Sequence, residues 1–102
     1  MSTDLALKRF KNTLEEHFGA GIEAVFLYGS RARGDAATDS DVDILVITRR
    51  ELCRAVRQVS AEVVSKLVCE GAPYISVFVM DAERWQWQTP FNENVRKDAV
   101  AL

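Results

Sequence analysis

The fold is decided by the stretch Val25-Phe26-Leu27-Tyr28-Gly29-Ser30 and, after a polar segment, Asp41-Val42-Asp43-Ile44-Leu45-Val46-Ile47. The first apolar run is typical of a strand that ends in a small turn, and the second begins with two acids separated by one residue. Because side chains alternate along a strand, both carboxylates would point from one face of a sheet. Two adjacent carboxylates repel each other and resist burial, so they favour a bound cation.

The acids and the turn together predict a metal and nucleotide site. Mg²⁺ prefers hard oxygen ligands, which makes Asp41 and Asp43 the candidate metal ligands and the candidate catalytic residues. Gly29 would let a phosphate approach the backbone, and the Ser30 hydroxyl could hydrogen-bond a phosphate oxygen. The Arg31 guanidinium could offset triphosphate charge, although a solvated surface arginine is an equal alternative.

Composition restricts the classes of function. The chain has 102 residues, 48% of them hydrophobic, which predicts one domain over residues 1–102. A formal net charge of −2 gives no signal for nucleic-acid binding. No apolar run approaches the ~20 residues of a membrane span, and we expect no secretory signal at the N-terminus. Cys53 and Cys69 lie on one predicted helix, too far apart for a disulfide, so we expect a cytoplasmic protein with reduced thiols.

Hydrophobic periodicity predicts alternating helices and strands. The expected elements are a helix over 3–18, strands over 24–28 and 42–48, a helix over 50–70, a strand over 74–80, a short helix capped by Asp81, a helical turn over 91–98 and an edge strand over 99–102. This order indicates an α/β (α+β) fold, a small mixed β-sheet flanked by helices.

The segment from Gly29-Ser30 through Asp41-Val42-Asp43 resembles the signature of the nucleotidyltransferase superfamily that includes DNA polymerase beta, and within it the minimal nucleotidyltransferases. That resemblance implies the nucleotidyltransferase fold, Mg²⁺ with ATP or another nucleoside triphosphate, and Asp41 and Asp43 as metal ligands. It implies transfer of a nucleoside monophosphate to an acceptor hydroxyl. It also implies an all-helical HEPN partner, as in toxin–antitoxin pairs, with the acceptor on that partner.

One position departs from the family pattern. Active members carry a third carboxylate on a later strand. In this sequence the residue that resembles the matching position is Ser76, so a serine stands where those members have an acid. A hydroxyl is a poor metal ligand and a poor base at neutral pH. The alternative hypothesis is therefore a nucleotide-binding or antitoxin module that acts by contact with its partner. A homodimer, through the C-terminal strand or the aromatic cluster of Trp85, Trp87 and Phe91, is left open.

Overall fold

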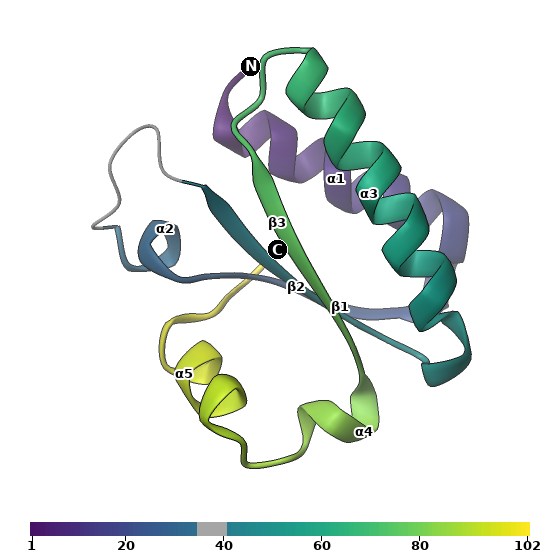
Figure 1. Cartoon of the computed structure of the whole chain (residues 1–102), viewed down its shortest axis with the longest axis vertical. Coiled ribbons are helices and arrows are strands. Elements are labelled where there is room, and N and C mark those ends of the chain that lie inside the picture. Colours follow the sequence, from purple (N-terminus) through teal and green to yellow (C-terminus); the bar gives the residue numbers. More distant parts are fainter. Residues whose placement is uncertain (35–40) are drawn as a thin grey trace.

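A four-stranded mixed sheet with helices on both faces forms the fold (Figure 1). The computed structural model describes residues 1–34 and 41–102. The elements are α1 (Thr3–Phe18), β1 (Ile22–Tyr28), α2 (Ser30–Arg33), β2 (Val42–Thr48), α3 (Cys53–Cys69), β3 (Ile75–Asp81), α4 (Ala82–Trp85), α5 (Pro90–Asp98) and β4 (Val100–Ala101), with 3₁₀ turns at Gly19–Gly21 and Arg50–Leu52. The predicted fold class is confirmed.

The strands are arranged in the order β3-β2-β1-β4. β1 is antiparallel to both β2 and β4, whereas β2 and β3 are parallel and are joined through α3. A parallel pair requires such a crossover, because its second strand must start at the same end as its first. The predicted C-terminal edge strand is confirmed as β4, which pairs with Phe26 and Leu27.

Alternation along β2 divides the interior into two cores. Val42, Ile44 and Val46 are buried against α1 and α3, whereas Leu45 and Ile47 are buried in the second core with residues of α4 and α5. Figure 1 shows the two pairs of helices on opposite sides of the sheet. The predicted strand over 42–48 is confirmed, and it is a central strand covered on both faces.

Side-chain caps fix where two of the helices begin. The Ser2 hydroxyl accepts a hydrogen bond from the Leu5 N–H at the start of α1, and the Thr89 hydroxyl accepts one from the Asn92 N–H at the start of α5. The predicted helix over 50–70 is shorter than expected, since its first three residues form a 3₁₀ turn. No helix among the described residues is long and apolar enough to cross a membrane.

Candidate functional site

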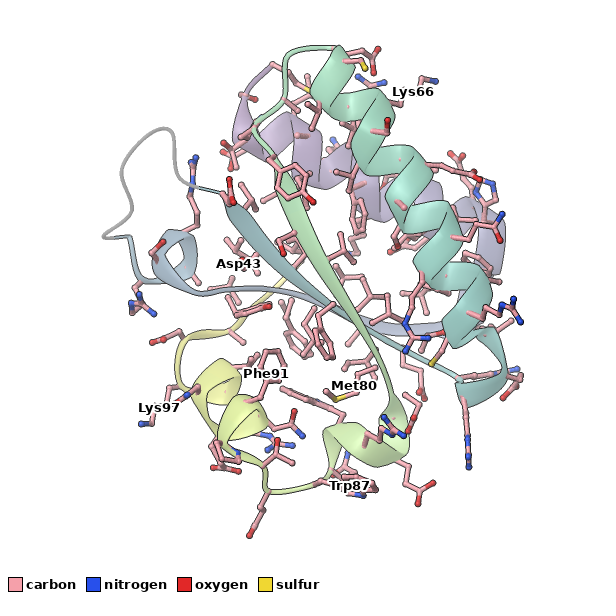
Figure 2. All side chains as sticks on the ribbon, in the orientation of Figure 1. Asp43, Lys66, Met80, Trp87, Phe91 and Lys97 are labelled. Atoms are coloured by element: carbon pink, nitrogen blue, oxygen red, sulfur yellow. The ribbon has the colours of Figure 1, made fainter. Side chains whose placement is uncertain are left out.

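Asp43 lies at the centre of the candidate site. It is the second residue of β2, and its neighbours across the sheet are Tyr28 at the end of β1 and Ser76 near the start of β3. Strand alternation puts the Asp43 side chain on the same face as Leu45, the face that α4 and α5 cover. Figure 2 shows Asp43 near the end of the sheet beside α2, on the same side as Phe91.

The two acids interact electrostatically. Burial raises the pKa of Asp43 above its ordinary value, and the negative charge of Asp41 raises it further. Asp41 precedes β2 and is exposed, so the carboxylate pair is half in the sheet and half in solvent. Both causes of the pKa shift disfavour the ionised form of Asp43, and a bound cation would act in the opposite direction. The donor set of two carboxylates therefore fits a hard divalent cation such as Mg²⁺.

Gly29 is required by its close approach to Asp43. Its φ is +78°, and a Cβ atom built on it would lie 2.6 Å from Oδ2 of Asp43, which is shorter than real Cβ contacts. The Gly29 carbonyl accepts hydrogen bonds from the N–H groups of Ala32 and Arg33 and so begins α2. The turn at the end of β1 is thus shaped around the Asp43 carboxylate, a requirement that adds to the sequence-based role of Gly29.

The residues of α2 connect the site to distant parts of the chain. Ser30 is the first residue of α2 and is half-buried beside Gly29. The Arg31 guanidinium donates a hydrogen bond to the Thr3 hydroxyl (3.3 Å), and Arg33 forms an ion pair with Asp98 of α5 (3.1 Å). The predicted site residues Gly29, Ser30 and Arg31 follow one another where β1 passes into α2, and Gly29 packs against Asp43 there.

The position beside Asp43 on β3 holds a serine. The parallel register pairs Asp43 with Ser76, as expected for the residue that replaces the third carboxylate. Asp81 lies at the far end of β3 opposite Thr48, and its side chain accepts a hydrogen bond from the Arg84 N–H as the N-cap of α4. Within residues 1–34 and 41–102, no group of three His, Cys, Asp or Glu side chains that could hold a metal ion was found.

The rings of Tyr28, Phe78 and Phe91 border the site on the same sheet face. The Phe91 ring lies 4.9 Å from the Phe78 ring and 5.8 Å, edge-on, from the Tyr28 ring. Burial and the charge of Asp43 raise the pKa of Tyr28, which keeps its hydroxyl protonated as a hydrogen-bond donor. Trp85 packs on Phe26 in the second core, whereas Trp87 is 52% exposed.

A small cavity opens next to Gly29. Its volume is about 260 Å³, and it is lined by Tyr28, Gly29, Arg33, Phe91, Asn94, Val95, Lys97 and Asp98. Sequence reasoning missed Phe78 as a neighbour of this region. The period of two along β3 was the available signal, because it puts Phe78 on the same face as Ser76.

Comparison with known proteins gives consistent matches. A family model described as "Nucleotidyltransferase domain" matches residues 7–97. A curated protein of Methanocaldococcus jannaschii, named "Putative protein adenylyltransferase", is 40% identical over 47 residues, 46% of this chain and 47% of that protein. The chain therefore spans about half the length of that relative.

Solved structures match over nearly the whole chain. A crystal structure of a "putative nucleotidyltransferase" from Sulfolobus solfataricus is 26% identical with a TM-score of 0.64, covering 97% of this chain and 78% of the other. A "putative minimal nucleotidyltransferase" is 27% identical with a TM-score of 0.60, covering 100% and 97%. A toxin–antitoxin structure with AMP-PNP is 20% identical with a TM-score of 0.57, covering 91% and 69%, and this likeness concerns the fold alone.

Proposed function

The chain belongs to the nucleotidyltransferase domain family, and on that basis we propose that it binds a nucleoside triphosphate with Mg²⁺, ATP first among them, and transfers the nucleoside monophosphate to a hydroxyl of a partner protein. The observation that carries the proposal is the contact geometry of Asp43. Its carboxylate is packed against Gly29, interacts with the charge of Asp41, and lies beside the turn that begins α2.

Each site residue has a distinct role in this proposal. Asp41 and Asp43 hold the metal, which when bound supplies positive charge against the charge developing on the phosphate oxygens. Gly29 and Ser30 bind the β- and γ-phosphates through the backbone and the hydroxyl, and Arg31 contributes positive charge. The acceptor oxygen bonds to the α-phosphorus, the bond from that phosphorus to its bridging oxygen breaks, and pyrophosphate leaves.

The nucleoside is assigned to the cavity beside Gly29. Its volume of about 260 Å³ lies next to the turn proposed to hold the phosphates, and two of its walls are the aromatic rings of Tyr28 and Phe91. Aromatic rings offer stacking surfaces to any nucleobase, which supports nucleotide binding without specifying the base. Lys97 adds positive charge to the same cavity, whereas Arg33 is ion-paired with Asp98, which lines the cavity as well.

Among the described residues, none beside the two acids provides a base for the acceptor hydroxyl. Ser76 occupies the position next to Asp43 and cannot accept a proton effectively at neutral pH. The acceptor protein is therefore proposed to bring its own base; a cation held by Asp41 and Asp43 would in addition lower the pKa of a hydroxyl placed next to it. From the resemblance of the motif to minimal nucleotidyltransferases, we propose a helical protein of the HEPN class as that acceptor.

A second candidate function follows from the same serine. A domain that keeps Asp41 and Asp43 but lacks the third carboxylate would serve as a nucleotide-binding module that neutralises its partner by contact. The two hypotheses share nucleotide binding and differ in group transfer. Incubating the chain with α-labelled ATP, Mg²⁺ and a candidate helical partner protein separates them, because only the enzyme leaves label on the partner.

Calorimetric titration of ATP tests the site that both hypotheses share. We expect binding that depends on Mg²⁺ and falls by at least about tenfold in Asp43→Asn, since the metal loses an anionic ligand. Glu62→Gln is the matched control, because Glu62 is an exposed acid on α3, across the sheet from the site. Equal affinity with and without Mg²⁺, or in Asp43→Asn and wild type, would overturn the proposal.

A further inference from the structure

One edge of the sheet is left open. β3 is the outermost strand, and no strand among the described residues pairs with its outer side. Tyr74, directly before the strand, is 57% exposed and Phe78 within it is 47% exposed. Residues 75–80 read Ile-Ser-Val-Phe-Val-Met, without a charge or a proline. Proteins normally protect such edges with lysine, proline or a bulge, so an unprotected apolar edge indicates a covered one.

The register with β2 determines which backbone groups of β3 point outward. The Tyr74 carbonyl accepts a hydrogen bond from the Val42 N–H (2.9 Å). In a parallel ladder every second residue bonds a given neighbour, so even-numbered residues of β3 bond β2. The N–H and C=O groups of Ile75, Val77 and Val79 therefore point away from the sheet and are available to another strand.

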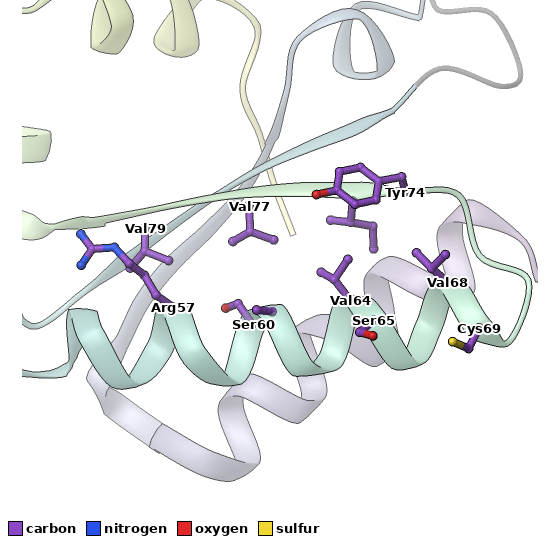
Figure 3. Close-up of a pocket in the computed structure, with 11 residues that line it drawn as sticks. Arg57, Ser60, Val64, Ser65, Val68, Cys69, Tyr74, Val77 and Val79 are labelled. Atoms are coloured by element: carbon purple, nitrogen blue, oxygen red, sulfur yellow. The ribbon is translucent and has the colours of Figure 1, made fainter.

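A groove runs along this edge between β3 and α3 (Figure 3). Its volume is about 550 Å³, and its strand side consists of Ile75, Val77 and Val79. On the helix side, the Ser60 hydroxyl is buried and has no hydrogen-bond partner in the part of the chain that the structure describes. Figure 3 shows Ser60 and Val64 pointing from α3 toward β3. The groove thus offers a mainly apolar surface that holds the unsatisfied Ser60 hydroxyl and is also lined by Arg57.

We propose that a second copy of this chain covers this edge, with the two β3 strands antiparallel about a two-fold axis at Val77. In this register Val77 faces Val77 of the second copy, and Ile75 faces its Val79. All three are residues whose backbone groups point outward, so each opposed pair can exchange two N–H···O bonds. The β-branched side chains of each pair meet on one face, which stabilises antiparallel pairing.

Self-complementarity is what favours a second copy over an unrelated strand. Pro73, which has no N–H, and Asp81, the helix cap, lie equally far from Val77 on either side. The uncharged segment is therefore centred on the proposed axis, and each end of it meets the other end of its copy. A two-fold interface needs this property, because the same patch must fit itself.

The α3 helices can accommodate this pairing. The two-fold axis puts both copies of α3 on the same face of the joined sheet, side by side above the groove. Ala61 and Ser65 line the groove from α3, and small side chains allow helix axes to approach to about 8 Å. Val68, which is exposed in the single chain, would be covered between the helices.

The second copy would also contribute a residue to the candidate site. On the opposite sheet face, this register places Phe78 of the second copy directly across from Ser76, which is itself beside Asp43. The row of side chains at the site then runs from Tyr28 through Asp43 and Ser76 to an aromatic ring of the other chain. The dimer thus extends the apolar border of the site.

Molar mass measured by light scattering over a concentration series tests the proposal. We expect wild type to approach twice the 11.4 kDa of one chain, whereas Val77→Pro weakens dimerisation about 10- to 100-fold, since two N–H···O bonds per dimer are lost. Proline at this position removes only an outward N–H and leaves the ladder with β2 intact. Val77→Ala is the control, because it shortens the side chain but keeps the N–H, and it should dimerise better than Val77→Pro. Wild type that stays monomeric, or Val77→Pro that dimerises like Val77→Ala, would overturn the proposal.

Cross-linking tests the register and does not depend on how well the proline variant folds. In a Cys53→Ser/Cys69→Ser background, Val77→Cys places two thiols about 5.5 Å apart at the Cα atoms, within disulfide reach. Ile75→Cys is the matched control, because in this register it faces Val79 and not itself. We expect mild oxidation to cross-link Val77→Cys at least tenfold faster than Ile75→Cys; equal rates would refute the two-fold axis at Val77.

Discussion

Replacing Gly29 by alanine perturbs the site at its closest approach. The new Cβ atom would lie 2.6 Å from Oδ2 of Asp43, where no real Cβ contact occurs, so the carboxylate must rotate or the turn must open. The backbone of Gly29 (φ 78°, ψ −157°) is also in a region that side chains rarely adopt. Gly29→Ala therefore combines a backbone cost with a collision at a proposed metal ligand.

Gly19 allows the two costs to be separated. It has a similar backbone (φ 53°, ψ −128°), but a Cβ atom on it would meet nothing within 4 Å. Gly19→Ala should lower the free energy of unfolding by about 1–3 kcal/mol through the backbone alone. Gly29→Ala should lower it by the same amount plus roughly 1 kcal/mol, the order of an off-rotamer Asp43 side chain.

Urea unfolding of the single and double variants measures the difference. In Gly29→Ala/Asp43→Ala the collision is absent, so the additional ~1 kcal/mol should be recovered relative to Asp43→Ala. Gly29→Ala alone should weaken Mg²⁺-dependent ATP binding, whereas Gly19→Ala should not. If Gly29→Ala costs no more than Gly19→Ala and ATP binding is unchanged, the carboxylate is not held by this turn and the reasoning is wrong.

Two further predictions concern stability. The raised pKa of Asp43 means that the folded chain binds a proton at this residue more tightly than the unfolded chain does. Protonated Asp43 therefore adds to the free energy of unfolding below its ordinary pKa of about 3.8, and this gain is lost as the pH rises through the raised pKa. In EDTA, Asp43→Asn should therefore melt above wild type at pH 7, with the difference shrinking toward pH 3; a lower melting temperature at pH 7 would contradict the shift. Asn92 is buried, and its amide donates to the carbonyls of Arg84 and Trp87 (2.9 Å each), joining α4 to α5. Asn92→Leu should cost about 1–3 kcal/mol in urea unfolding, while the exposed Asn94→Leu should stay within about 0.5 kcal/mol of wild type; equal costs would mean that these hydrogen bonds stabilise nothing.

Helix bounds could be predicted from the sequence because capping residues next to a helix determine where it begins and ends. The helix over 3–18 has its expected bounds, since Ser2 caps its start and Gly19 ends it with a positive φ. The N-cap role of Asp81 is confirmed in the same way. The first strand begins earlier than predicted, at Ile22, because pairing with β2 extends it beyond the apolar run. That extension depends on a partner strand, which no local pattern describes.

The arrangement of the site depended on contacts that sequence spacing does not encode. Gly29 and Asp43 are fourteen positions apart, and their contact results from antiparallel pairing of β1 with β2. The pairing of Asp43 with Ser76 likewise depends on the parallel crossover through α3. Motif reasoning supplied the residue types, and the predicted roles of Asp41, Asp43, Gly29, Ser30 and Arg31 remain predictions. Which residues lie next to them is determined by the register of the sheet.

Ser76 and the open edge lie on the same strand, and this has a consequence for catalysis. Even-numbered residues of β3 bond β2 and odd-numbered residues point outward, so a strand added at the edge lies about 4.8 Å from Ser76 and about twice that from Asp43. A second copy offers Phe78 at that point, which cannot act as a base. In the proposed reaction the acceptor hydroxyl would then approach over the sheet face between α2 and α5 and not across the edge. Removing the proposed metal ligand with Asp43→Asn should therefore weaken nucleotide binding without blocking dimerisation, whereas Val77→Pro should weaken dimerisation and remove from the site only the apolar border that Phe78 of the second copy adds.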